Sequence, residues 1–211
     1  MAAVFWDVDT QYDFMHADGR LYVPGSEEII PTLRRLTDHA HTRGIRIVAS
    51  ADDHVAEDRE ISSQPNWKDT FPEHCMHGTA GQRKIRETSL RNPLVLDPER
   101  ADPATLTQRV QRHDGDILFY KHTVDVFSNP NVLPVVDALA PQRIVLYGVA
   151  TDVCDRYAIE GLLRERPRIH LTLVTDAVRA ISAGQERALL EDWRRRGVTL
   201  ATSTEILGGE R

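Results

Sequence analysis

The segment that decides the fold is IVLYGVATDVCDRYAIEGLL, residues 144–163. Its first six residues are apolar, which favours a buried strand. The apolar positions 158, 159, 162 and 163 then recur at helical spacing, so residues 151–166 are predicted to form an amphipathic helix. Cys154 therefore lies just past the carboxyl end of a strand and at the start of a helix. In an open α/β sheet, this is where ligands bind.

Cys154 allows two interpretations at this position. A helix N-terminus favours the thiolate, and the thiolate is the nucleophilic form of cysteine. A free cysteine is also among the most frequently buried residues and often serves only as an apolar filler. The rest of the chain has to decide between a nucleophile and a packing residue.

Working outward from this segment, strand-like and helical segments alternate along the chain. This alternation is typical of a parallel sheet covered by helices on both faces. Strands are predicted over residues 3–8, 45–50, 116–120, 143–149, 170–175 and 198–201. Helices are predicted over residues 27–42, 103–113, 132–139, 151–166 and 184–196. We expect a three-layer αβα fold with a doubly wound, mostly parallel, six-stranded sheet, in a single domain spanning residues 1–211.

The composition excludes several classes of protein. The net charge of −6 argues against a general nucleic-acid-binding function. No apolar run is long enough to cross a membrane, and the N-terminus has no signal-peptide pattern. Two cysteines, Cys75 and Cys154, do not make a disulfide framework. We therefore expect a cytoplasmic protein that acts on a small molecule.

Two further polar residues end predicted strands. Asp9 follows the first strand, where its carboxylate could take the thiol proton and later return it to a leaving group. The alternative is a carboxylate that caps the next loop. Lys121 follows four apolar residues, and an ammonium near Cys154 would stabilise the thiolate and orient Asp9. The alternative is a lysine that snorkels at the edge of the sheet.

The segment 52–102 has little periodicity, and loops of that length are usually functional or disordered. Asp52 and His54 are two residues apart, so they lie on one side of an extended chain, and His74 follows. One carboxylate with two imidazoles is typical of a catalytic metal site with open positions for water or substrate. Zinc fits this set, and so does ferrous iron. The alternative is an acidic loop whose side chains are solvated.

In this order, the motifs resemble the nicotinamidase branch of the isochorismatase-like cysteine hydrolases. The matching segments are residues 9–14, 19–25, 52–54, 72–81, 119–121, 148–154 and 175–177. The resemblance implies a catalytic triad of Asp9, Lys121 and Cys154. It thus favours the nucleophile interpretation of the cysteine.

The resemblance also implies a metal held by Asp52, His54 and His74. We expect zinc, with iron and manganese as alternatives. Glu60 stands where some nicotinamidases have a further His or Ser ligand, so it could bind the metal directly or through water.

Around the nucleophile, the resemblance implies a cis peptide between Val149 and Ala150. This peptide would aim the backbone N–H groups of Ala150 and Cys154 at one point, forming an oxyanion hole.

The substrate pocket is predicted to contain Phe14, Phe71 and Phe127. Phe71 stands where many nicotinamidases have a tryptophan, and Trp67 could either compensate for that change or simply pack. Asp7 occupies a position that is usually apolar in the family.

The leading function is hydrolysis of nicotinamide to nicotinate and ammonia through a thioester, by a homodimer or homotetramer. The runner-up is an amidase for a maleamate-, carbamoyl- or ureidoacrylate-type substrate. Asp7 and Asp9 also fit weakly the motif of the haloacid dehalogenase phosphatases, although Gln11 stands where those enzymes have Thr or Val. A catalytically idle binding protein, with an inert buried cysteine, is the alternative outside enzymes.

Overall fold

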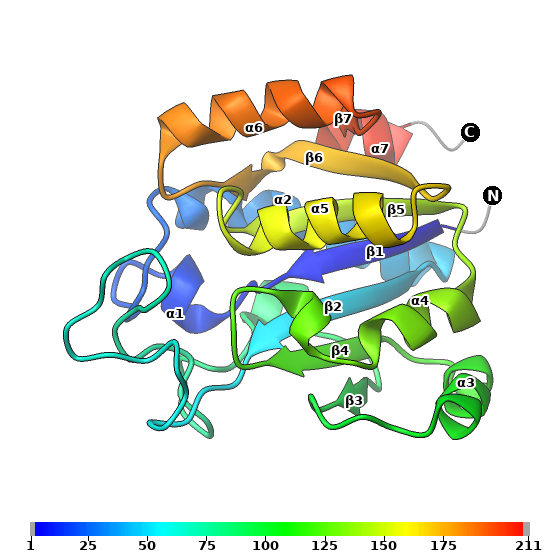
Figure 1. Cartoon of the computed structure of the whole chain (residues 1–211). Coiled ribbons are helices and arrows are strands. Elements are labelled where there is room, and N and C mark those ends of the chain that lie inside the picture. Colours follow the sequence, from blue (N-terminus) through cyan, green and yellow to red (C-terminus); the bar gives the residue numbers. More distant parts are fainter. Residues whose placement is uncertain (1–2, 209–211) are drawn as a thin grey trace.

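The computed structural model describes residues 3–208, and one seven-stranded sheet runs through them (Figure 1). The strand order is β3-β4-β2-β1-β5-β6-β7, and every pair of neighbouring strands is parallel. The strands are β1 (Ala3–Val8), β2 (Arg46–Asp52), β3 (Leu94–Leu96), β4 (Ile117–Lys121), β5 (Arg143–Val149), β6 (His170–Arg179) and β7 (Thr199–Ala201).

Helices cover both faces of this sheet, with α5 and α6 on one side and α2 on the other (Figure 1). The α-helices are α1 (Tyr12–Met15), α2 (Ser26–Arg43), α3 (Pro103–Arg112), α4 (Val132–Leu139), α5 (Cys154–Glu165), α6 (Ala183–Arg195) and α7 (Ser203–Gly208). Two short 3-10 helices are η1 (Arg86–Thr88) and η2 (Val126–Ser128). None of the described helices is long and apolar enough to cross a bilayer.

Successive side chains of β1 point to opposite faces of the sheet, so they pack into two separate hydrophobic cores. Trp6 packs with Phe119 and Trp193 in the core beneath helices α3 to α6. Phe5 packs with Tyr147 and the apolar stripe of α2 in the core on the opposite face. This two-sided burial explains why the central strands are almost wholly apolar in sequence.

Gly148 allows β5 to lie close beside β1. A Cβ atom at this position would come within 2.0 Å of the Val8 carbonyl oxygen, and the backbone φ of +135° also favours glycine. Because the two strands pair at Val8 and Gly148, the segments that follow them begin side by side.

The connections run outward from β1 in one direction and from β5 in the other. The chain passes from β1 to β2 and β4, and later from β5 to β6 and β7. This reversal creates a crevice at the carboxyl ends of the strands, where ligands bind in doubly wound sheets. The predicted α/β fold class is therefore confirmed.

The differences from the predicted elements are local. The seventh strand, β3, has three residues and lies inside the segment predicted to lack regular structure. Such a short run gives no periodic signal. β6 continues to Arg179, and α5 begins at Cys154 instead of at residue 151.

Candidate active site

Four strands deliver polar side chains to one edge of the sheet. Asp9 follows β1, Asp52 and Lys121 are the last residues of β2 and β4, and Cys154 begins the helix after β5. All four side chains are buried. The register places Asp52 opposite Lys121 across the β2–β4 pair, so their side chains start as neighbours.

Lys121 lies at the centre of this group. Its Nζ atom is 2.9 Å from Asp9 Oδ2 and 3.7 Å from Cys154 Sγ, and it also contacts Asp52 Oδ1 closely. The second oxygen of Asp9 accepts a hydrogen bond of 2.6 Å from the Ser50 hydroxyl. The predicted interaction of the lysine with both Asp9 and the cysteine is thus present.

Burial and charge set the protonation of the group in opposite ways. Burial alone would lower the pKa of the Lys121 ammonium, but Asp52 and Asp9 outweigh it and raise this pKa well above its ordinary value. Burial raises the pKa of the Cys154 thiol well above its ordinary range, and Lys121 opposes this only in part. The resting side chain is therefore a thiol. Any preference of the helix N-terminus for the thiolate is therefore smaller than the effect of burial, which agrees with the expectation that Asp9 takes a proton from the thiol.

The turn before Cys154 contains the cis peptide between Val149 and Ala150 that the family resemblance implied. The Ala150 carbonyl accepts hydrogen bonds from the N–H groups of Val153 and Asp155. Residues 3–208 also form backbone hydrogen bonds outside the regular strands and helices. In none of these is the N–H of Ala150 or of Cys154 the donor. Both donors are thus free to meet a substrate oxygen.

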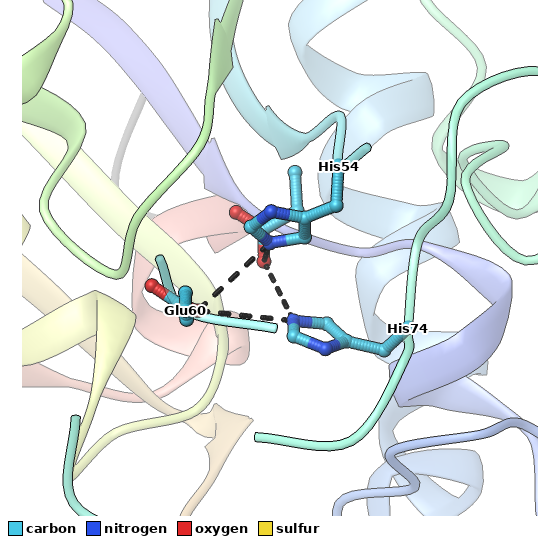
Figure 2. A group of neighbouring side chains, drawn as sticks. His54, Glu60 and His74 are labelled. Atoms are coloured by element: carbon cyan, nitrogen blue, oxygen red, sulfur yellow. Dashed lines mark ion pairs between the residues drawn. The ribbon is translucent and has the colours of Figure 1, made fainter. Parts of the chain in front are cut away.

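A second group of side chains lies beside the first. One donor atom from each of Asp52, His54, Glu60 and His74 lies within 4.8 Å of all the others, and all four residues are buried. In Figure 2, the labelled side chains of His54, Glu60 and His74 converge on one another. The separations between an imidazole nitrogen and a carboxylate oxygen run from 3.6 Å, between His74 Nε2 and Asp52 Oδ2, to 3.9 Å, between His54 Nε2 and Glu60 Oε1. Four ligands at typical zinc distances would lie about 3.3–3.6 Å apart.

In each imidazole, Nδ1 already lies within hydrogen-bond distance of an oxygen atom, which leaves Nε2 for a metal. His54 Nδ1 lies 3.0 Å from Asp58 Oδ2, and His74 Nδ1 lies 2.8 Å from the Pro72 carbonyl oxygen. His54 Nε2 is buried without a hydrogen-bond partner among the described residues. Because metal-binding histidines usually donate their other N–H to such acceptors, this donor set fits a divalent cation.

One pocket opens onto both groups. Its lining includes Cys154 together with Asp52, Glu60 and His74. Phe14 also lines it, and the ring of Phe14 lies 5.5 Å from that of His74. One pocket therefore reaches the thiol and three of the four metal-ligand candidates.

Comparison with known proteins places this site in a family. A family model described as the isochorismatase domain matches residues 3–205. The chain belongs to the isochorismatase family.

Relatives in this family include nicotinamidases and a pyrazinamidase. The nicotinamidase of Escherichia coli (strain K12) is 25% identical over 203 residues, which cover 83% of this chain and 82% of that protein. A probable inactive nicotinamidase of Arabidopsis thaliana is 22% identical over a region that covers 94% of this chain and 91% of that protein. The crystal structure of the Pyrococcus horikoshii pyrazinamidase in complex with zinc superposes with a TM-score of 0.75. The two sequences are 22% identical, and the matched region covers 96% of this chain and 99% of the pyrazinamidase chain.

The pocket of this isochorismatase-family chain confirms some predicted wall residues and corrects others. Phe14 and Phe71 line it as predicted. Trp67 does not, because its side chain is 65% exposed on the loop between Glu60 and Phe71. Phe127 does not either, because its ring packs against Gly161 of α5.

Sequence analysis missed the aliphatic part of the wall. These residues are Leu21, Val23, Val124, Val153 and Ile181. They come from loops after β1, β4, β5 and β6, and single aliphatic residues in loops carry no motif. The matches of residues 19–25 and 148–154 to the family were the only signals near any of them, since these segments contain Leu21, Val23 and Val153.

Proposed function

We propose that this protein is a metal-dependent cysteine amidohydrolase that converts nicotinamide to nicotinate and ammonia. The observation that carries the proposal is the shared pocket, which is lined both by Cys154 and by Asp52, Glu60 and His74. Such a pocket can hold one end of a small ring at the metal-ligand group and present an amide to the thiol. Positioning of this kind can account for a large part of an enzyme's rate enhancement.

The proposed reaction begins with a neutral thiol. Asp9 accepts the thiol proton while Cys154 Sγ forms a bond to the amide carbon. The resulting oxyanion accepts hydrogen bonds from the N–H groups of Ala150 and Cys154. Asp9 then gives its proton to the amide nitrogen, the C–N bond breaks, and ammonia leaves a thioester on the sulfur.

Hydrolysis of the thioester reuses the same groups. Asp9 accepts a proton from a water molecule whose oxygen attacks the thioester carbon, and the oxyanion returns to the same two N–H donors. The C–S bond then breaks, nicotinic acid forms and loses its carboxyl proton to water as nicotinate, and Asp9 returns the other proton to Cys154 Sγ. Lys121 stays protonated throughout, so it balances the charge of Asp9 whenever that carboxyl is ionised.

The residues proposed to hold the metal are Asp52, His54, Glu60 and His74. A divalent cation held there supplies an electron-pair acceptor for the ring nitrogen of the substrate. Burial raises the pKa of the Asp52 carboxyl, but Lys121, His54 and His74 together outweigh it and keep this pKa well below its usual range, so this ligand is ionised at neutral pH. We propose zinc because four N and O ligands suit it, with iron and manganese as alternatives because two of the ligands are carboxylates.

The charge of the pocket favours a neutral substrate over the runner-up amides. Maleamate- and ureidoacrylate-type substrates carry a carboxylate. The ionisable lining residues include the carboxyls of Asp52 and Glu60, whereas none of the described lining residues is Arg or Lys. Apart from the proposed metal, an anionic substrate would therefore find no cationic group among the described lining residues to pair with, whereas nicotinamide needs none.

The test is ammonia release from nicotinamide, maleamate and an N-carbamoyl amino acid, measured side by side. We expect the highest kcat/KM for nicotinamide, loss of activity with a chelator, and recovery on adding zinc, iron or manganese. Activity on maleamate or the carbamoyl compound but not on nicotinamide would contradict the proposed substrate. Full activity after complete metal removal would contradict the proposed metal dependence.

A further inference from the structure

Asp9 has a backbone conformation that is uncommon for a residue with a side chain, although aspartate adopts it more often than most. Its φ angle is +48°, in the left-handed region that side chains other than glycine seldom adopt. Such conformations persist only where the surrounding structure holds them in place. The residues on either side of Asp9 must therefore be fixed.

The preceding side is fixed by the sheet. Val8 pairs with Ser50 of β2 and with Gly148 of β5, so β1 ends between two strands. The Asp9 N–H continues this pairing with a hydrogen bond of 3.2 Å to the Ser50 carbonyl.

The following side is fixed by the hydroxyl of Thr10, which is fully buried. This hydroxyl donates to Asp7 Oδ1 at 2.8 Å and accepts from Lys84 Nζ at 2.7 Å. The Thr88 hydroxyl lies 2.7 Å away and supplies a third contact. Because a hydroxyl has one donor and two acceptor positions, these three partners can fill all of them.

Two of these partners form a buried ion pair. Lys84 Nζ lies 3.0 Å from Asp7 Oδ2, the Asp7 side chain is 1% exposed and the Lys84 side chain 10% exposed. A buried ion pair usually adds little to the free energy of unfolding, because well-packed apolar residues in its place often stabilise a protein as much or more. Asp7 lies in β1, two residues before Asp9, and this position points to a role in geometry.

We propose that the Asp7–Lys84 ion pair, acting through Thr10, positions Asp9 for proton transfer with Cys154. Lys84 and Thr88 come from the segment after His74, so the same contacts also attach that segment to β1. The inference rests on the proposed role of Asp9 as the base, and Asp7, Lys84 and Thr10 are positioning residues that do not touch substrate.

The first test replaces the ion pair with apolar side chains of similar size, in Asp7→Leu/Lys84→Met. If the pair only holds the fold together, this double variant should retain both structure and activity. If it positions Asp9, we expect a folded protein whose kcat falls by about tenfold to a hundredfold with little change in KM. A matched control is Asp116→Asn. Asp116 is another buried carboxylate, it accepts hydrogen bonds from backbone N–H groups, and it lies at the opposite end of the strands. This control should lower the melting temperature and leave kcat unchanged.

The second test acts on Thr10 alone, in case the double variant does not fold. Thr10→Val removes the hydroxyl at constant shape, whereas Thr10→Ser keeps it. We expect kcat to fall in Thr10→Val and to be restored in Thr10→Ser. Loss in both variants would contradict a role for the hydroxyl.

The third readout needs no substrate and separates this inference from the proposed function. It is the rate at which iodoacetamide alkylates Cys154 at pH 7, in a Cys75→Ala background. The nearby Asp9 carboxyl raises the pKa of the thiol, so an Asp9 that has moved away leaves more thiolate at pH 7. We therefore expect faster alkylation in the double variant and in Thr10→Val than in the parent and in Thr10→Ser. A wild-type alkylation rate in folded Thr10→Val would overturn the inference. A parent protein that does not hydrolyse nicotinamide would overturn only the proposed substrate.

Discussion

Lys121 joins the two halves of the candidate site through a single ammonium group. It contacts the carboxylates of Asp9 and Asp52, and its Nζ atom is 3.7 Å from Cys154 Sγ. A change at this residue therefore reaches both the thiol and the metal-ligand group. The two carboxylates also explain how this lysine can be fully buried, because they offset the cost of removing its charge from water.

The first prediction concerns the ionisation of Cys154. Lys121 lowers the pKa of this thiol against the larger effect of burial, so Lys121→Met should raise the pKa further. Less thiolate is then present at any given pH, so we expect alkylation at pH 7 to be slower than in the parent. The pH profile of iodoacetamide alkylation in a Cys75→Ala background measures this. An unchanged profile would remove the role assigned to Lys121.

The second prediction concerns a residue behind the metal-ligand group. Asp58 Oδ2 lies 3.0 Å from His54 Nδ1 and also accepts the Val55 N–H. Asp58→Ala should weaken metal binding by about tenfold to a hundredfold, since such outer contacts orient the ligand and raise its basicity. Titration against a chromophoric chelator measures the affinity. The exposed neighbour Glu57 provides the control, because Glu57→Gln should bind metal as the parent does, and equal affinity in both variants would count against the assigned geometry.

At the scale of elements, the strand ends could be predicted and the loops could not. An apolar run that stops at a polar residue identifies both a strand and its carboxyl end. Parallel strands share that edge, so Asp9, Lys121 and Cys154 could be expected to meet although they are far apart in sequence. The path of a loop depends on tertiary contacts instead. Sequence patterns therefore gave no sign that Ile181 lines the pocket or that Trp67 lies outside it.

The resting protonation of Cys154 is a further property that local sequence does not give. Its place at a helix start is visible in sequence, but the extent of its burial and the nearness of Asp9 are not. Both raise the pKa of the thiol, with burial the larger effect. Local sequence identified the nucleophile candidate and could not give its resting form.

The third prediction tests why Phe127 is absent from the pocket. A Cβ atom at Gly161 would come within 2.0 Å of the Phe127 ring, so Gly161→Ala should force α5 and η2 apart. Alanine improves helix propensity by about 1 kcal/mol, but overpacking typically costs about 1–3 kcal/mol, so we expect net destabilisation. Gly184 in α6 has open space around its Cβ position, and Gly184→Ala should be neutral or stabilising. Thermal unfolding of the two variants decides, and a stabilised Gly161→Ala would contradict the packing.

At the scale of the whole molecule, the metal-ligand group ties the long segment after β2 to the sheet. Asp52 is the last residue of β2, whereas His54, Glu60 and His74 come from that segment. A ligand that binds only the folded state stabilises it in proportion to the logarithm of its concentration. Metal loading should therefore stabilise the entire fold as well as the site.

The fourth prediction gives this effect a size. At a free metal concentration of about 100 times Kd, the stabilisation is about 2.7 kcal/mol. For a domain of this length we expect a melting temperature about 5–10 °C higher than in the chelated protein. His54→Ala should lose most of that difference. Identical melting curves with and without metal in the parent would show that these four side chains do not form the expected site.

The central claim is that Cys154 is the nucleophile of an amide hydrolase, and one comparison tests it most directly. The measurement is ammonia release from nicotinamide by the metal-loaded parent and by Cys154→Ala, with circular dichroism to show that the variant is folded. We predict turnover by the parent and none above background by the variant. Ammonia release at the parental rate by folded Cys154→Ala would contradict the account.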